Sequence, residues 1–309
     1  MKDIAFLVLA HTDPVQVGRL CRALDYRARI FVHLDAKVDI RPFLAQPLPE
    51  SVTFIKDRVR VSWAAYSQVE ATLRMMRAAL DSGHDFSHLV MLSGLDYPIK
   101  PLPSLHAFLN QNTGRELIKF VDASAQPAYR VFYEHYWFLE ANTWLRPASL
   151  DRLMRHGFGR VLRKFIRKPQ PKGMTCCWGS AYWALTPACA RHILEFSDSS
   201  PEYVQWARSS FAVDEHFFPT IVAHSRFLAP SEGFQSYVGT GPQTWRLGCL
   251  HINRRKTHTE ADFEELRDSD KFFVRKIMSG QSDRLVERLN AEILYADTAS
   301  ARLAESARA

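Results

Sequence analysis

Residues 91–100 read MLSGLDYPIK and mark the end of a central strand. The apolar run at 89–92 is typical of a buried strand, and the small residues Ser93 and Gly94 let the backbone turn where it ends. Pro98 has no amide hydrogen, so we expect the ladder of hydrogen bonds to stop before it. The sequence therefore predicts a strand followed by a tight loop.

Asp96 lies in this loop, directly after the strand. In α/β sheets, ligands bind outside the carboxyl ends of the strands, so a carboxylate here is a candidate for a functional site. A turn aspartate ahead of the helix that begins near Pro103 explains the residue equally well. The local sequence leaves both interpretations open.

The N-terminal third alternates between strands and helices. Residues 4–10 (IAFLVLA) form a continuous apolar run, as a parallel strand covered on both faces requires. Residues 15–24 have helical spacing, and further strands are predicted at 30–34 and 52–55. This order is a βαβ unit, so we expect an α/β fold with a central, mostly parallel (mixed) sheet flanked by helices.

Polar and aromatic side chains follow these strands. His11 ends the first strand, and Asp35 lies just past the second, where a carboxylate could hold a ribose or the edge of a base. A solvated loop aspartate is the simpler explanation of Asp35 from its position alone. Arg60 and Trp63 lie in the loop before an amphipathic helix at 69–80, where a tryptophan either packs or serves as a stacking platform.

The composition is that of an ordinary soluble globular protein. The chain has 309 residues, 47% of them hydrophobic and 24% charged, enough for one large domain or two small ones. Its net charge of +7 suggests an anionic partner such as a nucleotide, a nucleic acid or an acidic membrane surface. Much of the excess lies within 146–172, where residues 149–168 have the spacing of a basic helix that either touches an anionic membrane or presents a solvated face.

Cysteine usage and hydropathy indicate the cellular compartment in which we expect the protein. The 5 cysteines form no CxxC pair, which argues against a disulfide framework or a zinc site and favours a reducing cytoplasm. No apolar stretch approaches the roughly 20 residues that cross a bilayer, and the chain opens on a strand rather than a signal peptide. We therefore expect a cytoplasmic protein, soluble or at most peripheral at the inner membrane.

The second half combines aromatic residues with small residues that let the backbone come close to a ligand. Residues 129–144 interleave aromatic rings with polar groups such as Glu134, which suits stacking on a carbohydrate or the packing of a helix on the sheet. Residues 179–180 (GS) let the backbone approach a ligand closely. Tyr182 and Trp183 then begin another strand.

Two adjacent acids follow. Asp214 and Glu215 precede an apolar run, so they lie at a helix N-terminus, where the helix dipole favours the ionised carboxylate. Such acids are commonly structural, but one that points into a cleft would be a natural general base. Further along, we expect a short strand at 247–250, a helix at 260–267 and a surface helix that frays after about Ala296.

Six stretches occur in an order that is far more specific than any one of them. They are VHLDAK (32–37), RVSW (60–63), LSGLDYPI (92–99), GSAYW (179–183), DEHFF (214–218) and FVRK (273–276). The set resembles the core-2/I-branching N-acetylglucosaminyltransferases and the related peptide O-xylosyltransferases over roughly residues 4–280. The compact form, without a stem or membrane anchor, resembles a bacterial member.

The resemblance implies a GT-A-like single domain at 1–296, with a nucleotide-sugar half at about 1–125, an acceptor and catalytic half at about 126–280 and a tail at 297–309. It implies an inverting glycosyltransferase that moves a sugar, GlcNAc first, from a UDP-sugar to a hydroxyl of a glycan or glycolipid in bacterial surface-polysaccharide synthesis. A xylosyltransferase-like activity and a non-catalytic nucleotide-sugar- or carbohydrate-binding protein are the alternatives. The basic residues gather on one predicted helix without an RRM or OB stacking motif, so we expect no nucleic-acid partner.

Members of this family work without a divalent metal. The D-x-D at 268–270 lies in a charged C-terminal segment rather than after a central strand, where a metal-using GT-A enzyme needs its carboxylates. Fixed cations must then neutralise the departing UDP. We expect no metal and no cofactor beyond the UDP-sugar donor.

The resemblance also assigns roles. Glu215 matches the catalytic base, and Lys276 matches the lysine that binds the nucleotide phosphates. Asp35 matches an aspartate that contacts the nucleoside, and Asp96 matches one near the donor sugar. The candidate set is Glu215 and Asp96 for catalysis; Asp35, His11, Arg60, Trp63, Lys276, Arg254 and Arg255 for the nucleotide sugar; and Glu134, Ser180, Tyr182, Trp183 and Asp214 for the acceptor.

One element of the family pattern is missing. Members usually carry a second phosphate-binding arginine on a strand that ends in an aromatic residue, and the best register puts Gly248 and Ile252 at these two positions. Arg246, Arg254 or Arg255 could supply the missing cation.

Overall fold

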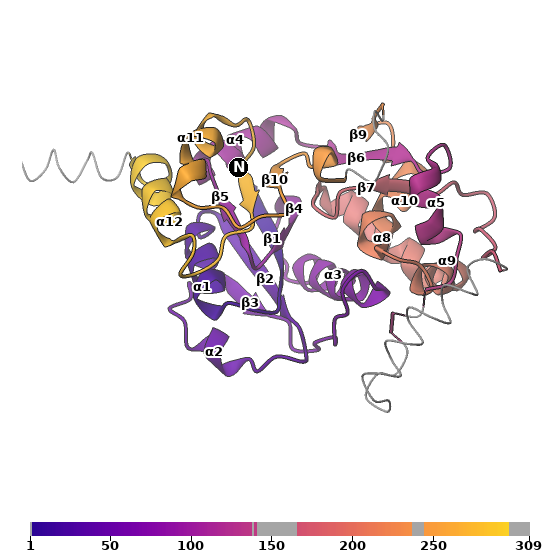
Figure 1. Ribbon diagram of the computed structural model, residues 1–309, viewed down its shortest axis with the longest axis horizontal. Helices are drawn as coiled ribbons and strands as arrows, with labels where there is room; N and C mark the ends of the chain where they lie inside the picture. The colour runs from indigo at the N-terminus through magenta and orange to yellow at the C-terminus, as the bar shows by residue number, and fades with distance from the viewer. Residues whose placement is uncertain (1, 138, 141–165, 237–243, 297–309) are drawn as a thin grey trace, which may run out of the picture.

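An eight-stranded mixed sheet is the centre of the computed structural model, which describes residues 2–137, 139–140, 166–236 and 244–296 (Figure 1). Its strands are β1 (Asp3–Ala10), β2 (Ala28–Leu34), β3 (Val52–Phe54), β4 (Phe86–Ser93), β6 (Glu116–Asp122), β7 (Cys177–Gly179), β8 (Ala184–Leu185) and β9 (Ser231–Phe234). Their order is β3-β2-β1-β4-β8-β6-β7, with β9 beside β6.

The strands β3, β2, β1 and β4 are parallel, so their carboxyl ends meet at one edge of the sheet. The short β8 is antiparallel to both β4 and β6 and joins the two halves of the sheet. Ala10 pairs with Leu34, and Ser93 pairs with the residue before Ala10, so β1, β2 and β4 end side by side. The loops that follow them share one edge.

Helices cover both faces of this sheet. They are α1 (Pro14–Ala23), α2 (Arg41–Leu44), α3 (Tyr66–Leu80), α4 (Leu102–Gln111), α5 (Pro127–Tyr133), α8 (Pro187–Ser199), α9 (Pro201–Arg208) and α10 (Phe217–Ala223). Alternate residues of β1 point to opposite faces. Ala5 and Leu7 join a core with α3 and α8, whereas Ile4, Phe6 and Val8 join a core with α1 and α4. The expected α/β fold with a mixed central sheet is confirmed.

A smaller sheet follows the end of β4. Its three strands in the described chain are β5 (Asp96–Pro98), β10 (His251–Asn253) and β11 (Phe273–Arg275), in the order β10-β11-β5. The helices α11 (Phe263–Asp268) and α12 (Asp283–Leu289) cover it, and the short helical turns η5 (Glu260–Asp262) and η6 (Asn290–Leu294) adjoin them. Two further turns are η3 (Val213–Glu215) and η4 (Thr244–Leu247). Figure 1 shows this C-terminal layer, in yellow, beside the indigo α1.

Two local predictions are wrong. The main ladder does stop at Ser93, but Pro98 belongs to a new strand, where it lies opposite Phe273. A proline is tolerated there because β5 is an edge strand that pairs only with β11 among the described strands. The strand expected at 247–250 lies at His251–Asn253 instead, after the η4 turn.

Gly94 allows the chain to pass from one sheet to the other. A Cβ at this position would lie 2.9 Å from Ala10 Cβ and 2.9 Å from Val17 Cγ2. Both distances are shorter than real Cβ contacts, so any larger residue would push the β4–β5 turn away from β1 and α1. The glycine therefore sets how closely the end of β4 approaches the end of β1.

The predicted basic helix falls largely on residues 149–165, which lie outside the described residues, as does the tail at 297–309. Its final residues, 166–168, are not helical. Lys168 is buried rather than solvated: its Nζ donates to the Trp206 carbonyl at 2.9 Å and to Ser210 Oγ, and burial lowers its pKa to about 7. No helix in the described part of the chain is long and apolar enough to span a membrane.

Candidate active site

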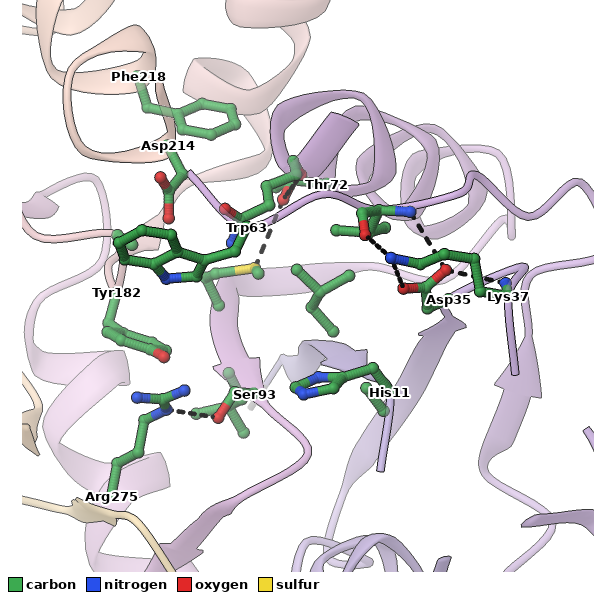
Figure 2. Close-up of a pocket in the computed structure, with 17 residues that line it drawn as sticks. His11, Asp35, Lys37, Trp63, Thr72, Ser93, Tyr182, Asp214, Phe218 and Arg275 are labelled. Atoms are coloured by element: carbon green, nitrogen blue, oxygen red, sulfur yellow. Dashed lines mark hydrogen bonds and ion pairs between the residues drawn. The ribbon is translucent and has the colours of Figure 1, made fainter. Parts of the chain in front are cut away.

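A cavity of about 250 Å³ opens at the shared carboxyl edge of the main sheet (Figure 2). Residues at the ends of β1, β2 and β4 line it together with the loop at 61–63, α3, η3, α10 and β11. Figure 2 shows Asp35 at one end, Asp214 and Arg275 at the other, and His11 between them. The cavity therefore combines residues from both halves of the chain.

Asp35 fixes the loop at one end of the cavity. Its carboxylate is only 4% exposed, and Oδ1 accepts hydrogen bonds from the backbone N–H of Lys37 at 2.9 Å and of Val61 at 3.2 Å. The Lys37 Nζ lies 3.3 Å from Oδ2. Asp35 thus holds the backbone at the cavity wall, and Lys37 adds a positive charge there.

His11 lies in the middle of the cavity, at the end of β1. Burial lowers its pKa, the Asp35 carboxylate opposes this effect, and the positive charges of Arg275 and Lys276 reinforce it. The imidazole is therefore neutral at pH 7 and offers one hydrogen-bond donor and one acceptor. Lys276, which directly follows Arg275, does not itself line the cavity.

Arg275 brings a fixed positive charge to the cavity wall. Its Nε donates to Ser93 Oγ at 2.9 Å, and the guanidinium lies 5.7 Å from the centre of the Tyr182 ring. The side chain is 22% exposed, so its charge is only partly screened by solvent. A guanidinium in this setting suits an anionic ligand, because it presents paired N–H donors to a phosphate or carboxylate.

Asp96 lies behind the wall and does not line the cavity. It has no exposed surface, and its carboxylate accepts from Ser93 N at 2.7 Å and from Ser93 Oγ at 3.0 Å. Arg275 Nε lies 3.7 Å from Oδ1, and His251 Nε2 lies 3.6 Å from Oδ2. Asp96 was expected near the donor sugar; it does not itself line the cavity, whereas Ser93 and Arg275, which lie against its carboxylate, do.

The η3 turn supplies two carboxylates that differ in surroundings. Asp214 lines the cavity, and burial raises its pKa to about 6 against the opposing charge of Arg275. Glu215 does not line the cavity, and its Oε2 accepts a hydrogen bond of 2.9 Å from Trp178 Nε1. The turn thus presents one carboxylate to the cavity and ties the next one to the core.

Aromatic rings complete the wall beside Asp214. Trp63 is 78% exposed and contacts Phe211 edge to face, with ring centres 5.5 Å apart. In Figure 2 its indole lies between Asp214 and Tyr182. The Tyr182 ring packs on His251 at 4.8 Å, and burial raises its pKa, so the phenol stays neutral. An exposed indole beside a polar cavity suits stacking on a sugar ring.

Residues 4–236 match the family model described as Core-2/I-Branching enzyme. The chain belongs to this family. It is similar to the mouse beta-1,3-galactosyl-O-glycosyl-glycoprotein beta-1,6-N-acetylglucosaminyltransferase 4, with 24% identity over 226 residues, 71% of this chain and 46% of the relative. The bovine herpesvirus 4 protein named beta-1,3-galactosyl-O-glycosyl-glycoprotein beta-1,6-N-acetylglucosaminyltransferase is 25% identical over 224 residues, again 71% and 46% of the two chains. The chain spans about half the length of these curated relatives.

A solved structure also aligns with this Core-2/I-branching chain. The apo crystal structure of mouse xyloside xylosyltransferase 1 covers 88% of this chain and 97% of that chain, with 12% sequence identity and a TM-score of 0.37.

Part of the candidate set expected for a Core-2/I-branching protein lies together. The residues of that set that line the cavity are His11, Asp35, Trp63, Tyr182 and Asp214. Ser180 is buried just behind Tyr182, and its Oγ accepts from the Tyr182 N–H at 3.1 Å. These residues come from segments that are far apart in the sequence, so the fold alone brings them together.

Other candidates lie elsewhere. Trp183 is buried in the core against Phe218, at 5.2 Å between ring centres, because it points away from the cavity that its neighbour Tyr182 lines. Glu134 forms an ion pair of 2.6 Å with Arg130. Three of the cations expected to hold the nucleotide do not line the cavity: Arg254 pairs with Glu265, and Arg60 and Arg255 are exposed.

Arg275 is the cation that the sequence did not single out. It lies within the FVRK stretch, directly before Lys276. Its exposure to the cavity depends on the pairing of β11 with β5, which the sequence did not predict. Arg275 lines the cavity, whereas Arg246, Arg254 and Arg255 do not.

The D-x-D acids lie in a separate groove. Asp268 binds Arg267 at 2.9 Å, and Asp270 lies 3.3 Å from Lys271. Both acids line a groove beside β10 rather than the cavity. The described residues contain no group of three or more His, Cys, Asp or Glu side chains placed to hold a metal ion.

Proposed function

We propose that the chain is an inverting glycosyltransferase that transfers a sugar, GlcNAc first, from a UDP-sugar to a hydroxyl of a glycan acceptor. The observation that carries the proposal is the single cavity in which the Arg275 guanidinium, the neutral His11 imidazole and the Asp214 carboxylate face one another. The names of the relatives, which specify beta-1,6-N-acetylglucosaminyl transfer, support GlcNAc as the first donor to test.

The shape of the cavity suggests how the donor lies. The nucleoside is placed at the end formed by Asp35 and Lys37, where backbone groups and one cation are available. The diphosphate then reaches His11 and Arg275, with Lys276 nearby. The sugar comes next to Asp214, beside the exposed Trp63 indole. This order puts positive charge at the leaving group and a carboxylate at the reacting carbon.

The reaction proposed for this site is a direct displacement. A carboxylate takes the proton of the acceptor hydroxyl, the acceptor oxygen forms a bond to the anomeric carbon, and the bond from that carbon to the UDP oxygen breaks. The electron pair leaves with UDP, whose charge Arg275 and Lys276 stabilise. Attack opposite the leaving group inverts the anomeric centre, and general-base help of this kind is typically worth about 10²–10⁴-fold.

Glu215 is the proposed base. The match to the family motif supports it, and the Trp178 hydrogen bond gives its carboxylate a fixed orientation. Asp214 is the second candidate, favoured by its place on the cavity wall and by a pKa of about 6. Amide variants of each residue separate the two assignments.

The reaction is proposed to need no divalent metal. The D-x-D acids are paired with Arg267 and Lys271 in a separate groove, whereas Arg275 lies at the cavity itself. We place the reaction in the cytoplasm, on a surface-polysaccharide or glycolipid precursor, with peripheral contact to an anionic membrane supported by the net charge of +7.

UDP release tests the proposal. Purified protein is incubated with UDP-GlcNAc, UDP-xylose, UDP-glucose or UDP-galactose, with and without glycan acceptors, and UDP is measured. Turnover of UDP-GlcNAc that Arg275→Gln abolishes is the expected result. A preference for UDP-xylose would support the xylosyltransferase alternative. Binding of UDP-sugars without turnover would support a non-catalytic binding protein.

A further inference from the structure

The smaller sheet places Asp96 and Arg275 directly opposite each other on neighbouring strands. In the antiparallel pair of β5 and β11, Arg275 is the backbone partner of Asp96, although the two residues are far apart in the chain. Directly opposed residues of an antiparallel pair project from the same face of a sheet. The register therefore delivers a cation from the C-terminal part of the chain to the end of β4, where the cavity opens.

The side chains around this pair form a closed network. Asp96 accepts two hydrogen bonds from Ser93 and lies 3.7 Å from Arg275 Nε and 3.6 Å from His251 Nε2. Arg275 Nε donates to the same Ser93 hydroxyl at 2.9 Å. His251 is itself packed between Tyr182 and Phe273, at 4.8 Å and 5.1 Å between ring centres. The network leaves Arg275 little freedom at its Nε end.

The other end of the guanidinium is available. Within the described residues, no hydrogen bond of Arg275 uses its two terminal nitrogens, and Figure 2 shows them directed towards the cavity. Two N–H groups held in a plane match two oxygens of a phosphate group. The guanidinium is thus fixed through Nε and presents its free donors to the cavity.

We propose that Asp96 is the positioning residue for Arg275, which receives the diphosphate of the donor. Asp96 does not touch the donor, because it has no exposed surface and lies behind Ser93. It acts by holding the Ser93 hydroxyl and the Arg275 guanidinium in the orientation that the diphosphate requires. The inference rests on the proposed function, since it takes the cavity to be a nucleoside diphosphate site.

Charge alone predicts the opposite effect. The Asp96 carboxylate also repels the diphosphate, so its neutralisation would tighten UDP binding if orientation did not matter. Asp96→Asn separates the two effects, because asparagine keeps the shape of the side chain and can still bond to Ser93 through its amide. If Asp96 orients Arg275, the loss of this charge weakens UDP binding despite the removal of repulsion.

The test measures binding of UDP and uridine to the full chain by titration calorimetry. For Asp96→Asn we expect UDP to bind about tenfold more weakly, as is typical when a group that orients a ligand-binding residue is lost, while uridine binding is unchanged. In the Arg275→Gln background, Asp96→Asn should weaken UDP binding no further. Glu116→Gln is the matched control: Glu116 is a buried carboxylate, 1% exposed and bonded to Thr186 away from the cavity, so its loss should leave UDP binding unchanged.

Four outcomes overturn the inference. If Asp96→Asn binds UDP as tightly as wild type, or more tightly, then the charge of Asp96 and not its orientation of Arg275 determines the affinity for UDP. Additive losses in the double variant would show that Asp96 acts independently of Arg275. Ser93→Ala, which removes the bridging hydroxyl and keeps the charge, should also weaken UDP but not uridine; unchanged UDP binding contradicts the network even if Asp96→Asn does not fold. Wild type that binds UDP no better than uridine would overturn the proposed function itself.

Discussion

Trp178 Nε1 donates a hydrogen bond of 2.9 Å to Glu215 Oε2, which ties the proposed base to the hydrophobic core. Trp178 has no exposed surface and packs against Tyr129 and His216, at 5.0 Å and 5.2 Å between ring centres. The indole therefore fixes the direction of the Glu215 carboxylate.

Trp178→Phe removes this donor while it keeps most of the ring packing. We expect the turnover rate of UDP release to fall about tenfold with the donor KM unchanged, since only the base is misplaced. The measurement is the rate of UDP release at saturating donor and acceptor.

Trp183→Phe is the control for this variant. Trp183 is also a buried tryptophan, but its Nε1 has no hydrogen-bond partner within the described residues. Its substitution should lower stability without lowering the turnover rate. An unchanged turnover rate in Trp178→Phe would show that the indole packs but does not orient Glu215.

Asp214→Asn should stabilise the fold at neutral pH. Burial raises the pKa of Asp214 to about 6, so the folded protein binds this proton more tightly than the unfolded chain, where the pKa is about 3.9. The carboxyl therefore lowers stability as the pH rises from about 4 to about 6. The melting temperature of Asp214→Asn should exceed that of wild type at pH 7.5. At pH 3.5 the two melting temperatures should be equal.

Asp39→Asn supplies the opposite case for the same melting experiment. The hydrogen bond from Arg41 lowers the pKa of the exposed Asp39. Replacing this carboxylate should therefore not raise the melting temperature at pH 7.5. Equal melting of Asp214→Asn and wild type at pH 7.5 would mean that Asp214 is ionised without penalty.

Trp63→Ala should affect binding rather than folding. The side chain is 78% exposed, so its removal should leave the melting temperature within the range of ordinary surface substitutions. We expect KM for the donor sugar to rise about 3- to 10-fold, the size of one lost ring-stacking contact. Trp63→Phe should recover much of the loss. A large drop in melting temperature would instead assign Trp63 to the core.

Removal of divalent metal should leave the activity unchanged. Protein treated with EDTA is expected to release UDP at the same rate as untreated protein, because Arg275 and Lys276 are proposed to neutralise the leaving group. Strong inhibition that Mn²⁺ reverses would contradict metal-independent transfer, whichever residues held the ion.

The strands and the strand-end residues were predictable because they follow local rules. The apolar run at 4–10 is β1, and His11 and Asp35 lie at the cavity because parallel strands end at one edge. The split between Tyr182 at the cavity and Trp183 in the core was not predictable, since it depends on how the chain enters β8.

Arg275 and Asp96 show the limit of sequence reasoning most clearly. Each follows a recognisable motif, but their opposition arises from a pairing between strands that are far apart in the sequence and only three residues long. Strands of this length carry too little periodic signal to reveal a partner or a register. Arg254 was among the cations that the sequence offered, and the fold places Glu265 beside it.

The rate of UDP release from UDP-GlcNAc by Glu215→Gln, compared with wild type at saturating donor and acceptor, tests the central claim most directly. The account predicts a fall of at least about 100-fold with UDP affinity retained, because the substitution removes the base and leaves the cations of the cavity in place. Equal rates in the two proteins would contradict the assignment of Glu215. A comparable fall in Asp214→Asn alone would move the role to the carboxylate that lines the cavity.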